Sequence, residues 1–192
     1  MNQRKAKHKI NDLFIKRWSP RAMSGKPIKQ EELMQIFEAA RWAPSSYNGQ
    51  PWHFLYAKRD TKEWNIFFKL LVEFNQQWVK NAAILCVVLS KKIFDHNGKP
   101  NSTHSFDTGA AWENLALQGS IINIVVHGMA GFDYDKAKTV LKIPDDYDVE
   151  AMIAIGKPGK KEDLPEAMRE KEFPSERKKV EQFVTEGAWK AP

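Results

Sequence analysis

The stretch Ala43-Pro44-Ser45-Ser46-Tyr47-Asn48-Gly49-Gln50-Pro51-Trp52 is the most informative part of this chain. Pro44 and Pro51 each fix φ and remove a backbone donor. Each also moves the residue before it out of the α region. We therefore predict a stiff loop with free N–H groups and short polar side chains, in which Gly49 supplies an unusual φ. Such a loop suits a polar, planar ligand, although an ordinary helix-to-strand connection uses the same residue types.

A helix is predicted before this loop and a strand after it. Apolar residues at 33, 36, 37 and 40 follow helical spacing, which predicts a helix over 31–41, and 52–57 is typical of a strand. Elsewhere the patterns predict helices over 10–17, 64–79, 107–127 and 135–141, strands over 82–90 and 151–155, and a polar loop over 94–106.

Two of these elements have apolar residues on all of their faces. The strand over 82–90 should be central and covered on both faces. The helix over 107–127, capped by Asp107 or Thr108 and ended by Gly128, should be buried on most sides. Helices around three or four short strands indicate an α+β or α/β layer with a small sheet.

The length of 192 residues suits one domain over 1–192. Residues 1–9 resemble a flexible basic tail. Residues 160–192 have few apolar side chains, so we expect this arm to wrap another surface, either this domain or a partner chain.

Composition excludes several classes of protein. The longest apolar run, 82–89, is too short to cross a bilayer. The net charge is +6, but acidic residues interleave with the basic ones in the arm, which argues against a nucleic-acid partner. The single Cys86 cannot form an internal disulfide and no secretory signal is visible, so we expect a cytoplasmic protein without a membrane partner.

Motifs for hydrolytic, metal and nucleotide-fold chemistry are missing from the sequence. The five histidines lack metal-ligand spacing, and neither a Gly-x-Gly-x-x-Gly nor a P-loop occurs. Cys86 lies in an apolar run, which disfavours a nucleophilic role. Arg17, Ser19 and Arg21 could bind an anion through charge-assisted hydrogen bonds, or could be surface charges beside a turn cap.

In four places the chain resembles the nitroreductase family of FMN-dependent oxidoreductases. These are Arg17-Trp18-Ser19-Pro20-Arg21, the loop 43–54, the stretch 107–132, and 153–156 followed by Arg177. The resemblance implies an α+β fold with a small mixed sheet flanked by helices. It also implies an intertwined homodimer with exchanged C-terminal tails and two FMN sites at its interface.

The resemblance further implies how FMN is held. Arg17 and Ser19 match residues at the phosphate, Arg21 lies near the ring edge, and Trp18 contributes through its backbone. Arg177 completes the phosphate site, although Ser175 stands where the family often has Lys or Arg.

Further positions are implied around the flavin ring. Pro44, Ser45, Ser46 and Asn48 match the loop that lies against the ring from across the interface. Ala130 and Gly131 match the segment that passes N5. Asn75 and Gln76 are expected at the pyrimidine end, although a polar helix face explains them equally well.

The implied reaction has two half-reactions. NADH or NADPH passes a hydride to flavin N5, and a small-molecule acceptor such as a nitroaromatic or a quinone then takes its place in ping-pong order. No catalytic acid, base or metal on the protein is implied. The alternatives are a relative with another flavin reaction (dehalogenase, flavin-fragmenting or dehydrogenase) and a non-catalytic flavin-binding protein.

Overall fold

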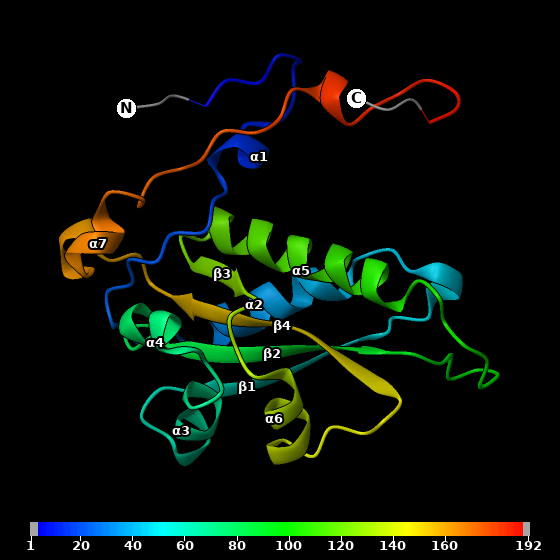
Figure 1. The fold of residues 1–192 in the computed structure, drawn as a ribbon, viewed down its shortest axis with the longest axis horizontal. Coiled ribbons are helices and arrows are strands. Elements are labelled where there is room, and N and C mark those ends of the chain that lie inside the picture. Colours follow the sequence, from blue (N-terminus) through cyan, green and yellow to red (C-terminus); the bar gives the residue numbers. More distant parts are fainter. Residues whose placement is uncertain (1–3, 190–192) are drawn as a thin grey trace.

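A four-stranded sheet forms the centre of the computed structural model, which describes residues 4–189 (Figure 1). The strand order is β1-β2-β4-β3. The strands are β1 (Trp52–Lys58), β2 (Ile84–Lys91), β3 (Val125–Met129) and β4 (Tyr147–Gly156). The α+β class is confirmed, but the expected mixed sheet is wrong for the described residues, because its three pairings are all antiparallel.

Helices cover both faces of the sheet (Figure 1). They are α1 (Asp12–Lys16), α2 (Gln30–Arg41), α3 (Lys62–Phe68), α4 (Glu73–Val79), α5 (His104–Ile121), α6 (Tyr134–Val140) and α7 (Glu166–Arg169). Short 3-10 turns lie at Ser46–Asn48, Lys161–Asp163 and Val180–Gln182. None of the described helices is both long and apolar enough to span a bilayer.

The two faces of the central strand β2 enter different cores. Ile84, Cys86 and Val88 pack with α2 and α5, whereas Leu85 and Val87 pack with α3 and α4. This period of two explains why the strand is apolar throughout. The prediction that it is covered on both faces is confirmed.

The predicted helix over 64–79 is wrong, because the chain forms two helices, α3 and α4, separated at residues 69–72. Backbone groups at the break bond to a distant segment instead of continuing the helical ladder. Val72 N–H donates to the Gly131 carbonyl at 3.1 Å, and Asp133 N–H donates to the Leu70 carbonyl at 2.9 Å. Tertiary pairing therefore overrides local helical periodicity.

The predicted helix over 107–127 has the wrong bounds. It begins at His104 with Thr103 as N-cap, so neither Asp107 nor Thr108 caps it, and Val125–Met129 is a strand. The chain reverses at Asn123, which has a φ of 56°. An uninterrupted apolar run fits a helix and a buried strand equally well, and pairing with β4 decides in favour of the strand.

The loop between α2 and β1 is strained at residues other than its glycine. Gly49 has an ordinary φ of −71°, so the predicted unusual φ is wrong. The left-handed values belong to Tyr47 (51°), Asn48 (52°) and Gln50 (45°). The Ser46 N–H donates to Asp107 Oδ2 at 3.0 Å, which ties the loop to the first turn of α5.

The described N-terminal segment from residue 4 and the C-terminal arm run together, away from the sheet (Figure 1). Arg4 Nη1 donates to the carbonyls of Ile15 and Arg17 at 3.0 Å each, and its Nε donates to the Ser175 carbonyl at 2.9 Å. In the arm, Leu164 and Met168 are buried, but the large apolar side chains beyond them are exposed: Phe173, Phe183, Val184 and Trp189. The single domain over 1–192 stays a prediction.

Candidate functional site

The segment of residues 17–22, which leads from α1 toward α2, separates two cavities. Arg17, Ser19 and Arg21 line a cavity of about 220 Å³, which we call the cation-lined cavity. Pro20 and Ala22 line a second cavity of about 370 Å³. Trp18 borders both. The alternation follows the period of two of extended backbone, so successive side chains point to opposite sides.

The cation-lined cavity carries an excess of positive charge. Its lining residues are Arg4, Arg17, Trp18, Ser19, Arg21, His127, Lys171, Phe173, Ser175 and Arg177. Arg17 Nε lies 3.4 Å from Glu113 Oε1, and Arg21 Nη1 lies 4.0 Å from Glu172 Oε2. Burial, and then the nearby charges of Arg177 and Arg17, lower the pKa of Arg4. Five cations facing one small cavity suit an anionic ligand.

His127 contributes shape to this cavity without contributing charge. Its Nδ1 lies 2.9 Å from the Pro20 carbonyl, and its ring centroid lies 4.6 Å from that of Trp78. Burial is the main cause that lowers the pKa of His127 to about 4. The ring is therefore neutral at pH 7, and Nδ1–H donates to the carbonyl of Pro20.

Glu172, from the C-terminal arm, fixes the segment 17–22 in place. Its Oε1 accepts hydrogen bonds from the backbone N–H groups of Arg21 at 2.7 Å and Ala22 at 2.9 Å. Its side chain is only 3% exposed. The first part of the arm therefore holds in position the residues that face the cation-lined cavity.

Asn75 and Gln76 are engaged inside the chain. Asn75 Nδ2 donates to the Gly131 carbonyl at 3.0 Å, and Asn75 Oδ1 accepts from Trp78 Nε1 at 3.2 Å. Gln76 Nε2 donates to the Leu71 carbonyl at 2.8 Å. Asn75 thus positions the backbone of Gly131, and Gln76 closes the turn between α3 and α4.

The loop residues Pro44, Ser45, Ser46 and Asn48 are not brought to the cation-lined cavity within one chain. They lie at the His104 end of α5 (Figure 1), whereas Arg17 pairs with Glu113, further along the same helix. The predicted site residues therefore lie in separate places. The cation-lined cavity has Arg17, Trp18, Ser19, Arg21 and Arg177. Asn75 contacts Gly131, Gln76 bonds to the Leu71 carbonyl, Ala130 lines another cavity, and the remaining residues belong to this loop.

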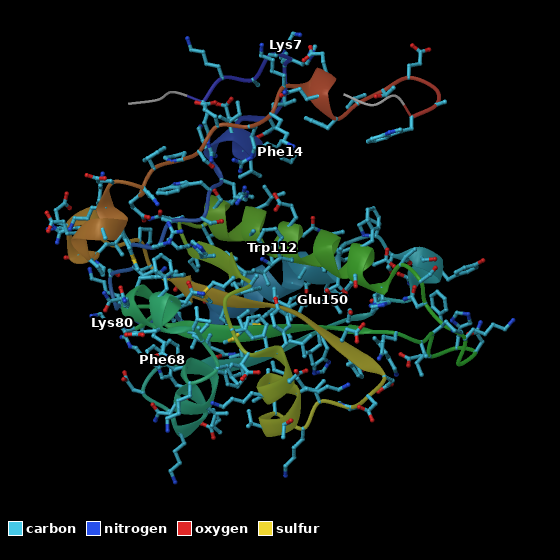
Figure 2. All side chains as sticks on the ribbon, viewed as in Figure 1. Lys7, Phe14, Phe68, Lys80, Trp112 and Glu150 are labelled. Carbon is cyan, nitrogen blue, oxygen red and sulfur yellow. The ribbon has the colours of Figure 1, made fainter. Side chains whose placement is uncertain are left out.

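A third cavity, of about 330 Å³, lies between α5 and the strands β3 and β4. Its lining residues are Val88, Ser105, Thr108, Gly109, Trp112, Gly128, Met129, Ala130, Glu150 and Ala151. Trp112 and Glu150 come from facing elements, α5 and β4 (Figure 2). Ser90 Oγ and Ser105 Oγ each donate to Glu150 Oε1 at 2.5 Å. We call this space the α5–β4 cavity.

Sequence reasoning missed Arg4, His127, Lys171 and Glu172. Arg4 and Lys171 lie in charged stretches that are indistinguishable from solvated tails. His127 sits within an apolar run and has no metal-ligand spacing. No local signal marks Glu172, because its partners lie about 150 residues away. The described residues contain no cluster of three or more His, Cys, Asp or Glu that could hold a metal.

Comparison with known proteins gives one consistent family. The model of the "Nitroreductase family" matches residues 15–73, which include the segment 17–22 and the strained loop. An oxygen-insensitive NADPH nitroreductase of Helicobacter acinonychis is 35% identical over 98 residues, 48% of this chain and 41% of that protein.

Solved structures are similar over a larger part of the chain. A structure described as an oxidoreductase containing FMN is 42% identical, with a TM-score of 0.94, over 100% of this chain and 98% of that one. A nitroreductase family protein from Clostridium novyi NT is 25% identical, with a TM-score of 0.65, over 80% of this chain and 87% of that one. Together with the alternating segment and the matching fold, these similarities show that the chain belongs to the nitroreductase family.

Proposed function

We propose that this chain is an FMN-dependent NAD(P)H oxidoreductase that reduces nitroaromatics, quinones or related acceptors. The observation that carries the proposal is the cation-lined cavity. This cavity is lined by Arg17 and Ser19 from one end of the sequence and by Arg177, which lies 160 residues after Arg17. The family membership and the FMN named for the 42%-identical relative support the same assignment.

The lining of the cavity fits a phosphate monoester. Guanidinium groups can bind phosphate oxygens in pairs, and the Ser19 hydroxyl adds a neutral donor 3.5 Å from Arg17 Nη1. Ser175 supplies no charge where the family often has a cation. Lys171 and Arg4 line the same cavity and compensate for it. Arg177 donates to Ser175 Oγ at 3.0 Å, which keeps its guanidinium beside that position.

The ring of the cofactor would lie beside Ala130 and Gly131, where Asn75 fixes the backbone. Bound FMN would supply the redox chemistry, taking a hydride from NADH or NADPH and returning it to an acceptor. The chain's own residues bind the phosphate, shape the ring site and orient the two substrates in turn. None of them needs to act as a nucleophile, and burial raises the pKa of the Cys86 thiol far above its usual range.

A homodimer would complete this site. The loop 44–48 lies away from the cation-lined cavity of its own chain, so it would reach the cavity of a partner copy. Phe106 and Ile121 on α5 are 82% and 60% exposed, and the apolar side chains of the arm are exposed as well. A second copy would cover this apolar surface.

The proposal is tested by titrating the chain with FMN. Arg17→Ala should weaken binding by about 1.5–3 kcal/mol, the range for hydrogen bonds to charged groups. Arg41→Ala, on an exposed face of α2, is the matched control and should leave the affinity unchanged. Equal affinity in Arg17→Ala and the wild type would refute the phosphate assignment.

Stopped-flow mixing tests the reaction itself. NADH or NADPH should bleach the bound FMN, and a nitroaromatic or quinone should reoxidise it. If neither nucleotide reduces bound FMN faster than free FMN, the chain is a flavin-binding protein instead of an oxidoreductase.

A further inference from the structure

We propose that the α5–β4 cavity binds the electron acceptor, and that it selects uncharged planar molecules carrying a hydrogen-bond-accepting oxygen. The inference rests on the proposed function, since it names the acceptor subsite of the same reaction. Ala130, which would border the flavin, also lines this cavity. A molecule held there would therefore lie next to the cofactor.

Gly109 keeps the mouth of the cavity open. Glycine inside a helix is destabilising relative to alanine, so its presence at a helical position needs a reason. Neither a positive φ nor a close neighbour supplies one, because a Cβ added to Gly109 would meet nothing within 4 Å. In contrast, Gly119 on the same helix is required by packing, since its Cβ would lie 2.7 Å from Val126 Cγ2. Gly109 is exposed and lines the cavity, so a ligand entering there would meet no side chain at this position.

Two polar groups on the cavity wall lack partners. Thr108 Oγ1 and Trp112 Nε1 are buried, and neither has a hydrogen-bond partner among the described residues. They lie four residues apart and so share one face of α5. Thr108 is 1% exposed. A buried donor left unpaired costs free energy, which an acceptor oxygen on a bound ligand would recover. Nitro and quinone oxygens are such acceptors.

Glu150 sets the charge preference of the cavity. Its carboxylate accepts hydrogen bonds from the Ser90 and Ser105 hydroxyls, which hold it at the wall. A carboxylate at this place repels an anionic ligand, because like charges in a partly buried site destabilise each other. Neutral arenes should therefore bind in preference to arenes that carry a carboxylate.

Gly128 gives the Trp112 indole room to lie against β3. A Cβ on Gly128 would lie 3.2 Å from Trp112 Cζ2 and 3.4 Å from Nε1. The indole ring therefore rests directly on the strand that leads to Ala130. This contact fixes the position of the Trp112 indole N–H relative to the backbone of Ala130, which would border the flavin.

The test uses binding of two ligands that cannot be reduced, benzamide and benzoate, to the FMN-loaded protein. Binding is followed by Trp fluorescence and by calorimetry. Benzamide should bind more tightly than benzoate. Gly109→Leu should fill the mouth and weaken benzamide binding by about tenfold or more. Glu150→Gln should lower the ratio of benzamide affinity to benzoate affinity by about fivefold, because the carboxylate no longer repels benzoate.

Three controls separate this proposal from others. Gly109→Ala should raise the Tm, which establishes that helix α5 accepts a side chain there. Gln118→Leu, on the same helix but lining none of the three cavities, should leave benzamide affinity unchanged. Sedimentation of Gly109→Leu should match the wild type.

The results for Gly109→Leu distinguish a failure of the acceptor subsite from a failure of the proposed oxidoreductase activity. If the wild type binds FMN and is reduced by NADPH, but Gly109→Leu binds benzamide as the wild type does, the acceptor subsite is wrong and the oxidoreductase stands. Loss of FMN affinity in Gly109→Leu would assign the cavity to the cofactor. A change of its oligomeric state would assign the cavity to the partner copy. Either result overturns the proposal.

Discussion

Asn75 and Gly131 are matched to each other across the gap between α4 and the end of β3. The Asn75 Nδ2 donates to the Gly131 carbonyl at 3.0 Å, and a Cβ on Gly131 would lie 2.6 Å from that same nitrogen. Val72 Cγ2 would lie 3.1 Å from it as well. A side chain at position 131 would therefore displace the Asn75 amide, so this packing favours glycine there independently of any ligand that approaches its backbone.

Gly131→Ala should displace the Asn75 amide and destabilise the fold by about 1–3 kcal/mol, as overpacking typically does. Urea denaturation measures this loss. In a double-mutant cycle with Asn75→Ala, the two changes should be non-additive by at least about 0.5 kcal/mol, because the truncated side chain vacates the space. Simple additivity would contradict the steric explanation.

The hydrogen bonds of Glu172 should stabilise the fold, whereas its negative charge should weaken FMN binding. Glu172→Ala leaves the buried N–H of Ala22 and the partly buried N–H of Arg21 without an acceptor and should cost about 1–3 kcal/mol of stability. Glu172→Gln keeps an acceptor oxygen and should cost less. It also removes the negative charge 4.0 Å from Arg21, so FMN should bind more tightly to Glu172→Gln than to the wild type.

Thermal denaturation and FMN titration of both Glu172 variants check this separation. Glu162→Ala, on the exposed surface of the same arm, serves as the control. Weaker FMN binding in a stable Glu172→Gln protein would mean that the carboxylate positions Arg21 more than it competes with the phosphate.

His127 should make the fold less stable as the pH falls. Its pKa is lowered from 6.5 to about 4, so between these values the unfolded chain binds more protons at this site. The stabilisation is complete above pH 6.5 and declines as the pH falls toward 4. At pH 5 the loss from this group should be about 2 kcal/mol.

Urea denaturation at pH 7.5 and 5.0 measures the effect of His127. His127→Gln should show a smaller stability difference between the two pH values than the wild type, whereas His96→Gln, on an exposed loop, should behave as the wild type does. If His127→Gln and the wild type lose the same stability between pH 7.5 and 5.0, His127 does not cause the pH dependence.

The exposed apolar arm predicts a stable dimer whose formation depends on that arm. Removing residues 178–192 should shift the sedimentation of the FMN-loaded protein from twice the chain mass of 22.2 kDa toward a single chain, because Phe183, Val184 and Trp189 lose their proposed contacts with the partner. Truncation after residue 189 serves as the control. An intact protein that sediments as a stable 22.2 kDa monomer would rule out the dimer.

Local sequence signals predicted the elements that depend on local chemistry. Helix α2 was identified because its apolar residues keep helical spacing, and strand β2 was identified because it is a short, continuous apolar run. The break at 69–72 and the strand β3 were missed because hydrogen bonds to Gly131 and pairing with β4 decide them. Such long-range partners leave no trace in a local pattern.

The same division holds for the candidate site. Arg17, Ser19, Arg21 and Arg177 were found through motifs, and they do line one cavity, while their role toward FMN stays a prediction. Glu172 was missed because its importance arises only when the arm folds back onto the segment 17–22. The φ of Gly49 was predicted wrongly because the left-handed values fall on Tyr47 and Asn48, in a loop that the side chain of Asp107, far along the chain, holds through the Ser46 N–H.

The alternation of residues 17–22 between two cavities makes the spacing of this segment as important as its composition. One extra residue placed after Trp18 would reverse the parity of everything that follows, turning Ser19 and Arg21 toward the larger cavity and Pro20 toward the cations. Two extra residues would restore the parity and only lengthen the path. Within this short stretch, tolerance to insertions should therefore depend on whether their length is odd or even.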